Sequence, residues 1–197
     1  MVTPPSLLPA TLVVTRATLP DDWRTLLSRP WLQDRPLQLF FLHHGVQWVA
    51  APVWSFLLEK TEEAAFCAQD HNDLHGPPPL PTIQPGGLAT LGRMIHHSAI
   101  TLSLPTPHWP SQPTTRGSKR IAILFETSRE HAMASLRLSA GLAGCDHAVS
   151  LFTPDDTPLP AEAQPYLEAL NALGARQITT SPDPSTLSQH YDVIIKI

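Results

Sequence analysis

The chain has 197 residues, a formal net charge of −4 and only 15% charged residues. This balance argues against a direct nucleic-acid partner, because nucleic-acid binding usually requires a basic face. Two cysteines without framework spacing do not indicate a disulfide scaffold. No apolar run of about 18 residues predicts a membrane span, and the first residues do not resemble a signal peptide, so we expect a cytoplasmic protein without membrane contact.

The first half of the chain alternates short apolar strands with amphipathic helices. We expect strands at 11–15, 37–42, 64–67 and 100–104, and helices at 49–58 and 88–95. Asp21 or Asp22 can cap one more helix, which carries Trp23, Leu26 and Leu27 on one face. Strands that alternate with helices predict a mostly parallel sheet covered on both faces.

A proline-rich stretch at 105–118 has no periodicity and predicts an extended linker. After it the same plan recurs, with strands expected at 120–125, 147–152, 177–180 and 191–197. Helices are expected from the N-cap Ser128 through Ala143, and from 161 to the C-cap Gly174. The predicted fold class is therefore α/β, with two tandem three-layer α/β/α domains at 1–104 and 119–197.

Cys67 is the most informative single residue. It ends the apolar segment 64–67 and leads directly into a polar turn, at a point where a helix can begin. Open α/β sheets bind their ligands at the carboxyl ends of strands, and helix N-terminal amides favour the reactive thiolate. The alternative interpretation is a small buried hydrophobic residue, which is the common fate of a free cysteine.

Five segments, taken in order, resemble one known family. They are 39–46, 66–76 and 87–102 in the first half, and 120–125 and 187–195 in the second. Their order and spacing, rather than any single motif, resemble the DsrE/DsrF (TusD/TusC) sulfur-relay family. The resemblance implies a fusion of a DsrE-like half with a shorter DsrF-like half, each with a flavodoxin-like fold.

The resemblance also implies an activity. Cys67 would carry sulfane sulfur as a persulfide between donor and acceptor proteins, in tRNA thiolation or in sulfur oxidation, without a cofactor. A DsrH/TusB-like subunit is the expected partner in a hetero- or homo-oligomer, and Trp48, Trp54 and Trp109 are candidate interface anchors or core residues. The second half has no matching cysteine, so Cys145 is expected to be structural.

Two histidines complete the predicted site. His71 lies four residues after Cys67, so in a helical turn it would share a face with the thiol and help to ionise it, unless it is a solvated loop residue. His43 and His44 end the neighbouring strand, and one of them can face the Cys67 pocket. We therefore take Cys67, His71 and His44 as the candidate catalytic residues.

The turn after Cys67 departs from the family pattern. Family members usually carry basic residues there, whereas 70–75 is acidic and rich in histidine. Asp70 and Asp73 either accept turn hydrogen bonds or, near Cys67, oppose thiolate formation. Two other functions stay open: a non-catalytic structural subunit, and a small metal-binding protein whose ligands would be Cys67, His71, His75 and His43 or His44.

Overall fold

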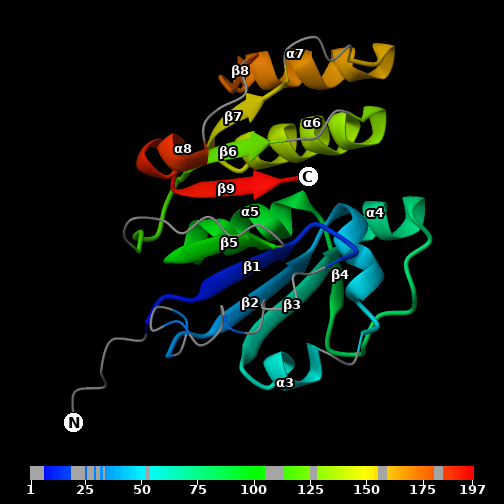
Figure 1. The fold of residues 1–197 in the computed structure, drawn as a ribbon, viewed down its shortest axis with the longest axis vertical. Helices are drawn as coiled ribbons and strands as arrows, with labels where there is room; N and C mark the ends of the chain where they lie inside the picture. Colours follow the sequence, from blue (N-terminus) through cyan, green and yellow to red (C-terminus); the bar gives the residue numbers. More distant parts are fainter. Residues whose placement is uncertain are drawn as a thin grey trace.

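The chain folds around two parallel sheets that lie side by side (Figure 1). The computed structural model describes residues 7–18, 25, 29, 32, 34–51, 54–104, 113–124, 128–154, 159–179 and 184–197. The predicted helix near Asp21, the linker residues 105–112 and Trp109 lie outside these residues. In the described part, no helix is long and apolar enough to cross a membrane.

The first sheet has five strands in the order β4-β3-β2-β1-β5, and every neighbouring pair is parallel. The strands are β1 (Ala10–Val14), β2 (Leu37–Phe41), β3 (Thr61–Cys67), β4 (Gln84–Gly86) and β5 (Ile100–Leu104). The runs of β1, β2 and β5 are buried along their whole length, as a sheet covered on both faces requires. The carboxyl ends of all five strands therefore meet at one edge.

The second sheet has four parallel strands in the order β8-β7-β6-β9. They are β6 (Arg120–Leu124), β7 (Ala148–Phe152), β8 (Arg176–Ile178) and β9 (Val193–Lys196). Strand β9 lies beside β5 of the first sheet (Figure 1), and the hydroxyl of Thr15 donates to the carbonyl of Lys196 across the seam, at 2.8 Å. The two halves are thus in direct contact.

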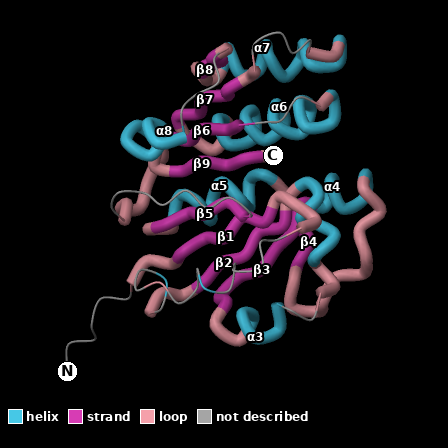
Figure 2. Tube along the Cα trace, viewed as in Figure 1, coloured by secondary structure: helices cyan, strands magenta, loops and turns pink. Residues whose placement is uncertain are grey.

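Helices cover both faces of the sheets (Figure 2). On one face α5 (Leu88–His97), α6 (Arg129–Ala143) and α7 (Gln164–Ala172) enclose one hydrophobic core that draws on both halves. On the other face η1 (His43–Trp48) and α3 (Ser55–Leu58) lie against the first sheet, and α8 (Pro184–His190) lies against the second. The short elements α4 (Ala68–Asp73) and η3 (Ala161–Ala163) precede β4 and α7. The predicted α/β class with mostly parallel sheets is confirmed.

Two finer predictions are not confirmed. A flavodoxin-like sheet has the strand order 2-1-3-4-5, whereas the first sheet here has β1 between β2 and β5. The helix expected over 49–58 is wrong in its first part, because the amides of Val49, Ala51 and Trp54 bond three residues back in tight turns. Among the described residues of this segment, a regular α-helix forms only at Ser55–Leu58.

Candidate functional site

Cys67 is the last residue of β3 and the N-cap of α4, as expected from the sequence. Its side chain joins the core cluster that contains Leu42 and α6 residues, and the residue is 6% exposed. Gly86 pairs with Cys67 on the neighbouring strand β4, so only backbone lies beside the thiol on that side. The sulfur is therefore at the ligand-binding edge of the sheet but below the molecular surface.

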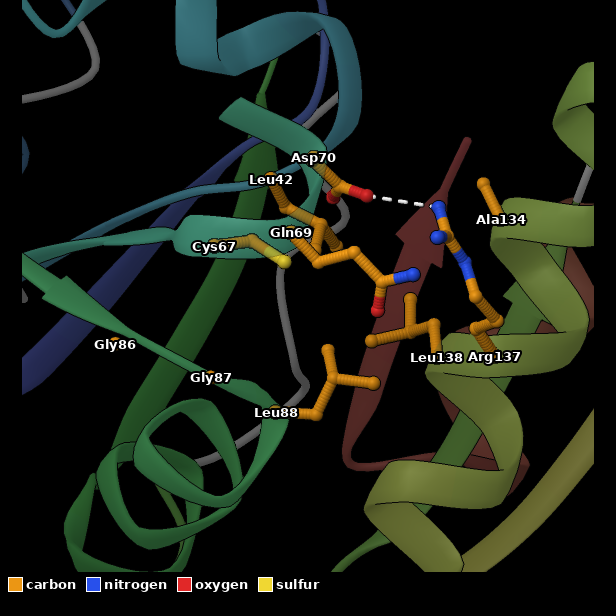
Figure 3. A pocket seen from close by; sticks show the side chains of 10 residues that line it. All are labelled: Leu42, Cys67, Gln69, Asp70, Gly86, Gly87, Leu88, Ala134, Arg137 and Leu138. Carbon is orange, nitrogen blue, oxygen red and sulfur yellow. Dashed lines mark hydrogen bonds and ion pairs between the residues drawn. The ribbon is translucent and has the colours of Figure 1, made fainter. Parts of the chain in front are cut away.

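The thiol lines a cavity of about 130 Å³ between the two halves (Figure 3). Two elements of the first half supply one wall, with Cys67 and Gln69 near the start of α4 and Gly87 and Leu88 at the start of α5. The second half supplies the opposite wall from α6, through Ala134, Arg137 and Leu138. The second half has no cysteine at the matching position, but it completes the environment of Cys67.

Asp70 links the two walls. Its carboxylate accepts the backbone N–H of His43 at 2.8 Å and forms an ion pair with Arg137 at 2.8 Å (Figure 3). Arg137 also contacts Asp73 at 3.2 Å. The side chains of Asp70 and Arg137 are 6% and 21% exposed, so this pair is largely shielded from water and its loss is costly. The turn after Cys67 has no arginine or lysine in its sequence, but Arg137 of α6 lies beside it in the folded chain.

The electrostatics of this site keep the thiol protonated. Burial, followed by the negative charge of Asp70, raises the pKa of Cys67 to about 11. The nearby backbone amides of Asp70 and Gln69 favour the thiolate and lower this pKa, but their effect is smaller. The side chain of Asp70, as an acceptor for the neutral thiol, acts in the opposite direction and raises the pKa further. The amides expected at the start of the helix are present, yet burial and Asp70 outweigh them.

His71 does not line the Cys67 cavity. Its ring packs on Phe66, with 4.8 Å between centroids, and its Nε2 lies 2.9 Å from the carbonyl oxygen of Pro77. Phe66 belongs to the core on the opposite face of the sheet from Cys67. His71 therefore holds the turn that closes at Gly76, whose backbone lies directly against the ring.

His43 and His44 lie at the start of η1, beyond the end of β2, and neither lines the Cys67 cavity. His43 is buried and lines a second cavity of about 540 Å³, together with Glu130, Arg137 and Tyr166. Burial, then the neighbouring charges of His44 and His131, lower the pKa of His43 to about 3. His44 is half-buried, and its Nε2 lies 3.3 Å from the carboxylate of Glu130.

The metal set expected around Cys67 does not form. Within the described residues, the group of metal-ligating side chains that come together is His43, His44 and His131. His131 is in the first turn of α6, 87 residues after His44. Sequence reasoning missed it because no local spacing connects the two positions.

Cys145 and the tryptophans have packing roles. An added Cβ on Gly92 of α5 would lie 2.6 Å from the sulfur of Cys145, so this cysteine fills the space where α5 meets the end of α6. Trp54 is fully buried and packs edge-on against Phe41, with 5.2 Å between ring centroids. Trp48 is partly buried beside Trp54. Neither tryptophan is an exposed anchor.

No protein-family model and no curated protein sequence matches this chain. The resemblance to the DsrE/DsrF family consequently stays a prediction from the five sequence segments.

The geometry adds two residues to the candidate site. Asp70 had been expected to act as a turn acceptor or to oppose the thiolate, and Arg137 carried no sequence signal, because its partners lie 67 and 64 residues away along the chain.

Proposed function

We propose that this chain is a sulfur-relay protein, in which Cys67 takes up sulfane sulfur as a persulfide and passes it to an acceptor thiol. One observation carries the proposal most directly. The sulfur lines a small cavity at the carboxyl edge of the sheet, together with the polar residues Gln69, Asp70 and Arg137. A thiol that is only packed in a core has no need of such polar neighbours.

The transfer step is a displacement at sulfur. The Cys67 thiol loses its proton to water, and the thiolate attacks the terminal sulfur of a donor persulfide. A new S–S bond forms on Cys67, the S–S bond of the donor breaks, and the donor leaves as a thiolate with the electron pair. Water then returns a proton to the donor thiolate. The amides of Gln69 and Asp70 stabilise negative charge on Cys67 during the attack.

The burial of Cys67 defines when this step takes place. At neutral pH the free chain holds the thiol protonated and 6% exposed, so the cavity must open before a donor persulfide reaches the sulfur. The facing walls come from different halves and are joined by the Asp70–Arg137 pair, which makes this pair the natural point of opening. We propose donor and acceptor thiol proteins and a DsrH/TusB-like subunit as partners in the cytoplasm, for tRNA thiolation or sulfur oxidation.

A second candidate is a structural subunit that performs no transfer. The low exposure of Cys67 and its raised pKa favour this candidate, because both reduce the reactivity of a thiol. The two candidates differ in one outcome: a carrier acquires sulfur on Cys67, and a structural subunit does not.

Intact-mass analysis separates them. Wild type, Cys67→Ser and Cys145→Ser would each be incubated with a low-molecular-weight persulfide at pH 7 and pH 9. A carrier gains the mass of one sulfur atom in wild type and Cys145→Ser but not in Cys67→Ser, with more product at the higher pH. If Cys67 gains no sulfur at either pH, while denaturation shows that the thiol is free, the relay proposal fails and the structural subunit stands.

A further inference from the structure

Three imidazole rings gather where the two halves meet, away from the Cys67 cavity. His43 and His44 follow β2, and His131 lies in the first turn of α6. The ring centroid of His43 lies 4.2 Å from that of His44 and 5.1 Å from that of His131. Each ring offers one ligand nitrogen, and these three nitrogens lie within 4.8 Å of one another. Neutral imidazole is the commonest nitrogen ligand for transition metals in proteins.

One nitrogen of the deepest of these rings has no hydrogen-bond partner. His43 is 2% exposed, and its Nε2 has no hydrogen-bond partner among the described residues. A buried polar nitrogen in this state is costly, and a bound ion is one of the few arrangements that account for it. The backbone of His43 also adopts a φ of 51°, which is rare for a residue other than glycine. Strain of this kind occurs preferentially at functional positions.

The charges around the cluster are compatible with a cation. The Glu130 carboxylate lies 3.3 Å from Nε2 of His44, an arrangement in which a carboxylate fixes the tautomer of a ligating histidine and leaves Nδ1 with its lone pair. Arg137 lies near His43, but its guanidinium is paired with the carboxylates of Asp70 and Asp73. The neighbouring cavity of about 540 Å³ reaches His43 and Glu130 and can admit a further ligand.

We propose that His43, His44 and His131 bind a divalent metal ion, with zinc as the expected species. Zinc–nitrogen bonds of about 2.0–2.1 Å in a tetrahedral site place the ligand nitrogens roughly 3.3 Å apart. The ligand nitrogens lie within 4.8 Å of one another, so each pair needs to close by at most about 1.5 Å to reach this geometry, and the rings of His44 and His131 are only half-buried. Three histidines leave a fourth coordination position free for water or a small ligand, as in catalytic zinc sites.

This site is independent of the proposed sulfur relay, because it shares no ligand with Cys67. It joins the end of β2 in the first half to α6 in the second, so an ion bound there would hold the two halves together. A ligand that binds only the folded chain raises its unfolding temperature. Metal binding therefore has two readouts that do not depend on any activity: the binding isotherm and the thermal unfolding midpoint.

The test uses the full chain, purified without a histidine tag and stripped with a chelator. Zn²⁺ would be titrated in competition with a chromophoric chelator, in wild type, His44→Ala, His131→Ala and the control His97→Ala. His97 is also half-buried and beside another histidine, with 5.3 Å between ring centroids. We expect wild type to bind one Zn²⁺ per chain, His44→Ala and His131→Ala to bind it at least tenfold more weakly, and His97→Ala to bind it as wild type does. Zinc should raise the unfolding temperature only of wild type and of the control His97→Ala.

Co²⁺ gives a second measurement on wild type that does not depend on how the variants fold. The proposal predicts the visible absorption of a tetrahedral Co²⁺ ion without the near-ultraviolet band of a cobalt–thiolate bond. A thiolate band would assign the metal to a cysteine and overturn the three-histidine site. Equal zinc affinity in wild type and both ligand variants, or the absence of tetrahedral Co²⁺ absorption, would show that the cluster is only packing.

Discussion

The reactivity of Cys67 follows quantitatively from its surroundings. Burial and the Asp70 charge raise its pKa from an ordinary value of 9.0 to about 11. At pH 7.5 this difference lowers the thiolate fraction by ~100-fold relative to an unperturbed thiol. A more basic thiolate is more nucleophilic, with a Brønsted slope of about 0.4–0.5, so each thiolate reacts roughly eightfold faster and part of this loss is offset. We therefore expect alkylation to be at least about tenfold slower than for a model peptide, before any effect of access.

The assay is the alkylation rate of the folded Cys145→Ser variant with iodoacetamide, measured by intact mass as a function of pH. Only Cys67 reacts in this background. The rate should rise about tenfold per pH unit up to roughly pH 10, because the thiol remains mostly protonated below its pKa. Adding Asp70→Asn removes the negative charge beside the sulfur and should raise the rate at pH 7.5. Circular dichroism at each pH checks that the chain stays folded.

The outcome that refutes this reasoning is a rate that levels off below about pH 9. It would mean that the amides of Gln69 and Asp70 outweigh burial and the carboxylate, and that the thiolate is already available in the free chain. An unchanged alkylation rate in Asp70→Asn would show separately that the Asp70 carboxylate does not raise the pKa of Cys67.

Two further predictions concern stability. Arg137→Leu should lower the free energy of unfolding, measured in urea, by about 3 kcal/mol, because it leaves a carboxylate buried without its cation. The control Arg129→Leu breaks an exposed ion pair and should lower it by no more than about 1 kcal/mol. Equal losses in the two variants would contradict the burial argument. Gly92→Ala should cost about 1–3 kcal/mol, because its new methyl group meets Cys145. Cys145→Ala removes the sulfur but keeps the Cβ of Cys145, which is equally close, so it should restore only part of this loss. Equal losses from Gly92→Ala in the wild-type and Cys145→Ala backgrounds, measured by thermal unfolding, would show that the sulfur takes no part in the clash.

Local sequence signals were sufficient for the regular elements. The apolar run 100–104 gave a strand with the predicted ends, and Ser128 caps α6 through a bond from the amide of His131. The position of Cys67 at the end of a strand could also be predicted from the sequence, because the apolar segment stops where the polar turn starts. These features depend on side-chain periodicity and on capping, which act over only a few residues.

Elements without such a signal form only in the context of the tertiary structure. The sequence of β4, Gln84-Pro85-Gly86, has low β propensity, and it is a strand because it pairs with the end of β3. The same applies to the strand order, since periodicity predicts that strands exist but not which strands are neighbours.

The sequence alone thus determined the α/β class, the positions of most regular elements and the cysteine at the edge of a sheet. Only the tertiary structure decided the chemistry around it. The ion pair of Asp70 with Arg137 joins residues 67 positions apart, and it depends on the packing of α6 against the first half. The gathering of His43, His44 and His131 has the same origin. Contacts of this kind arise from the burial of apolar faces on distant segments, and the spacing of residues along the chain does not encode them.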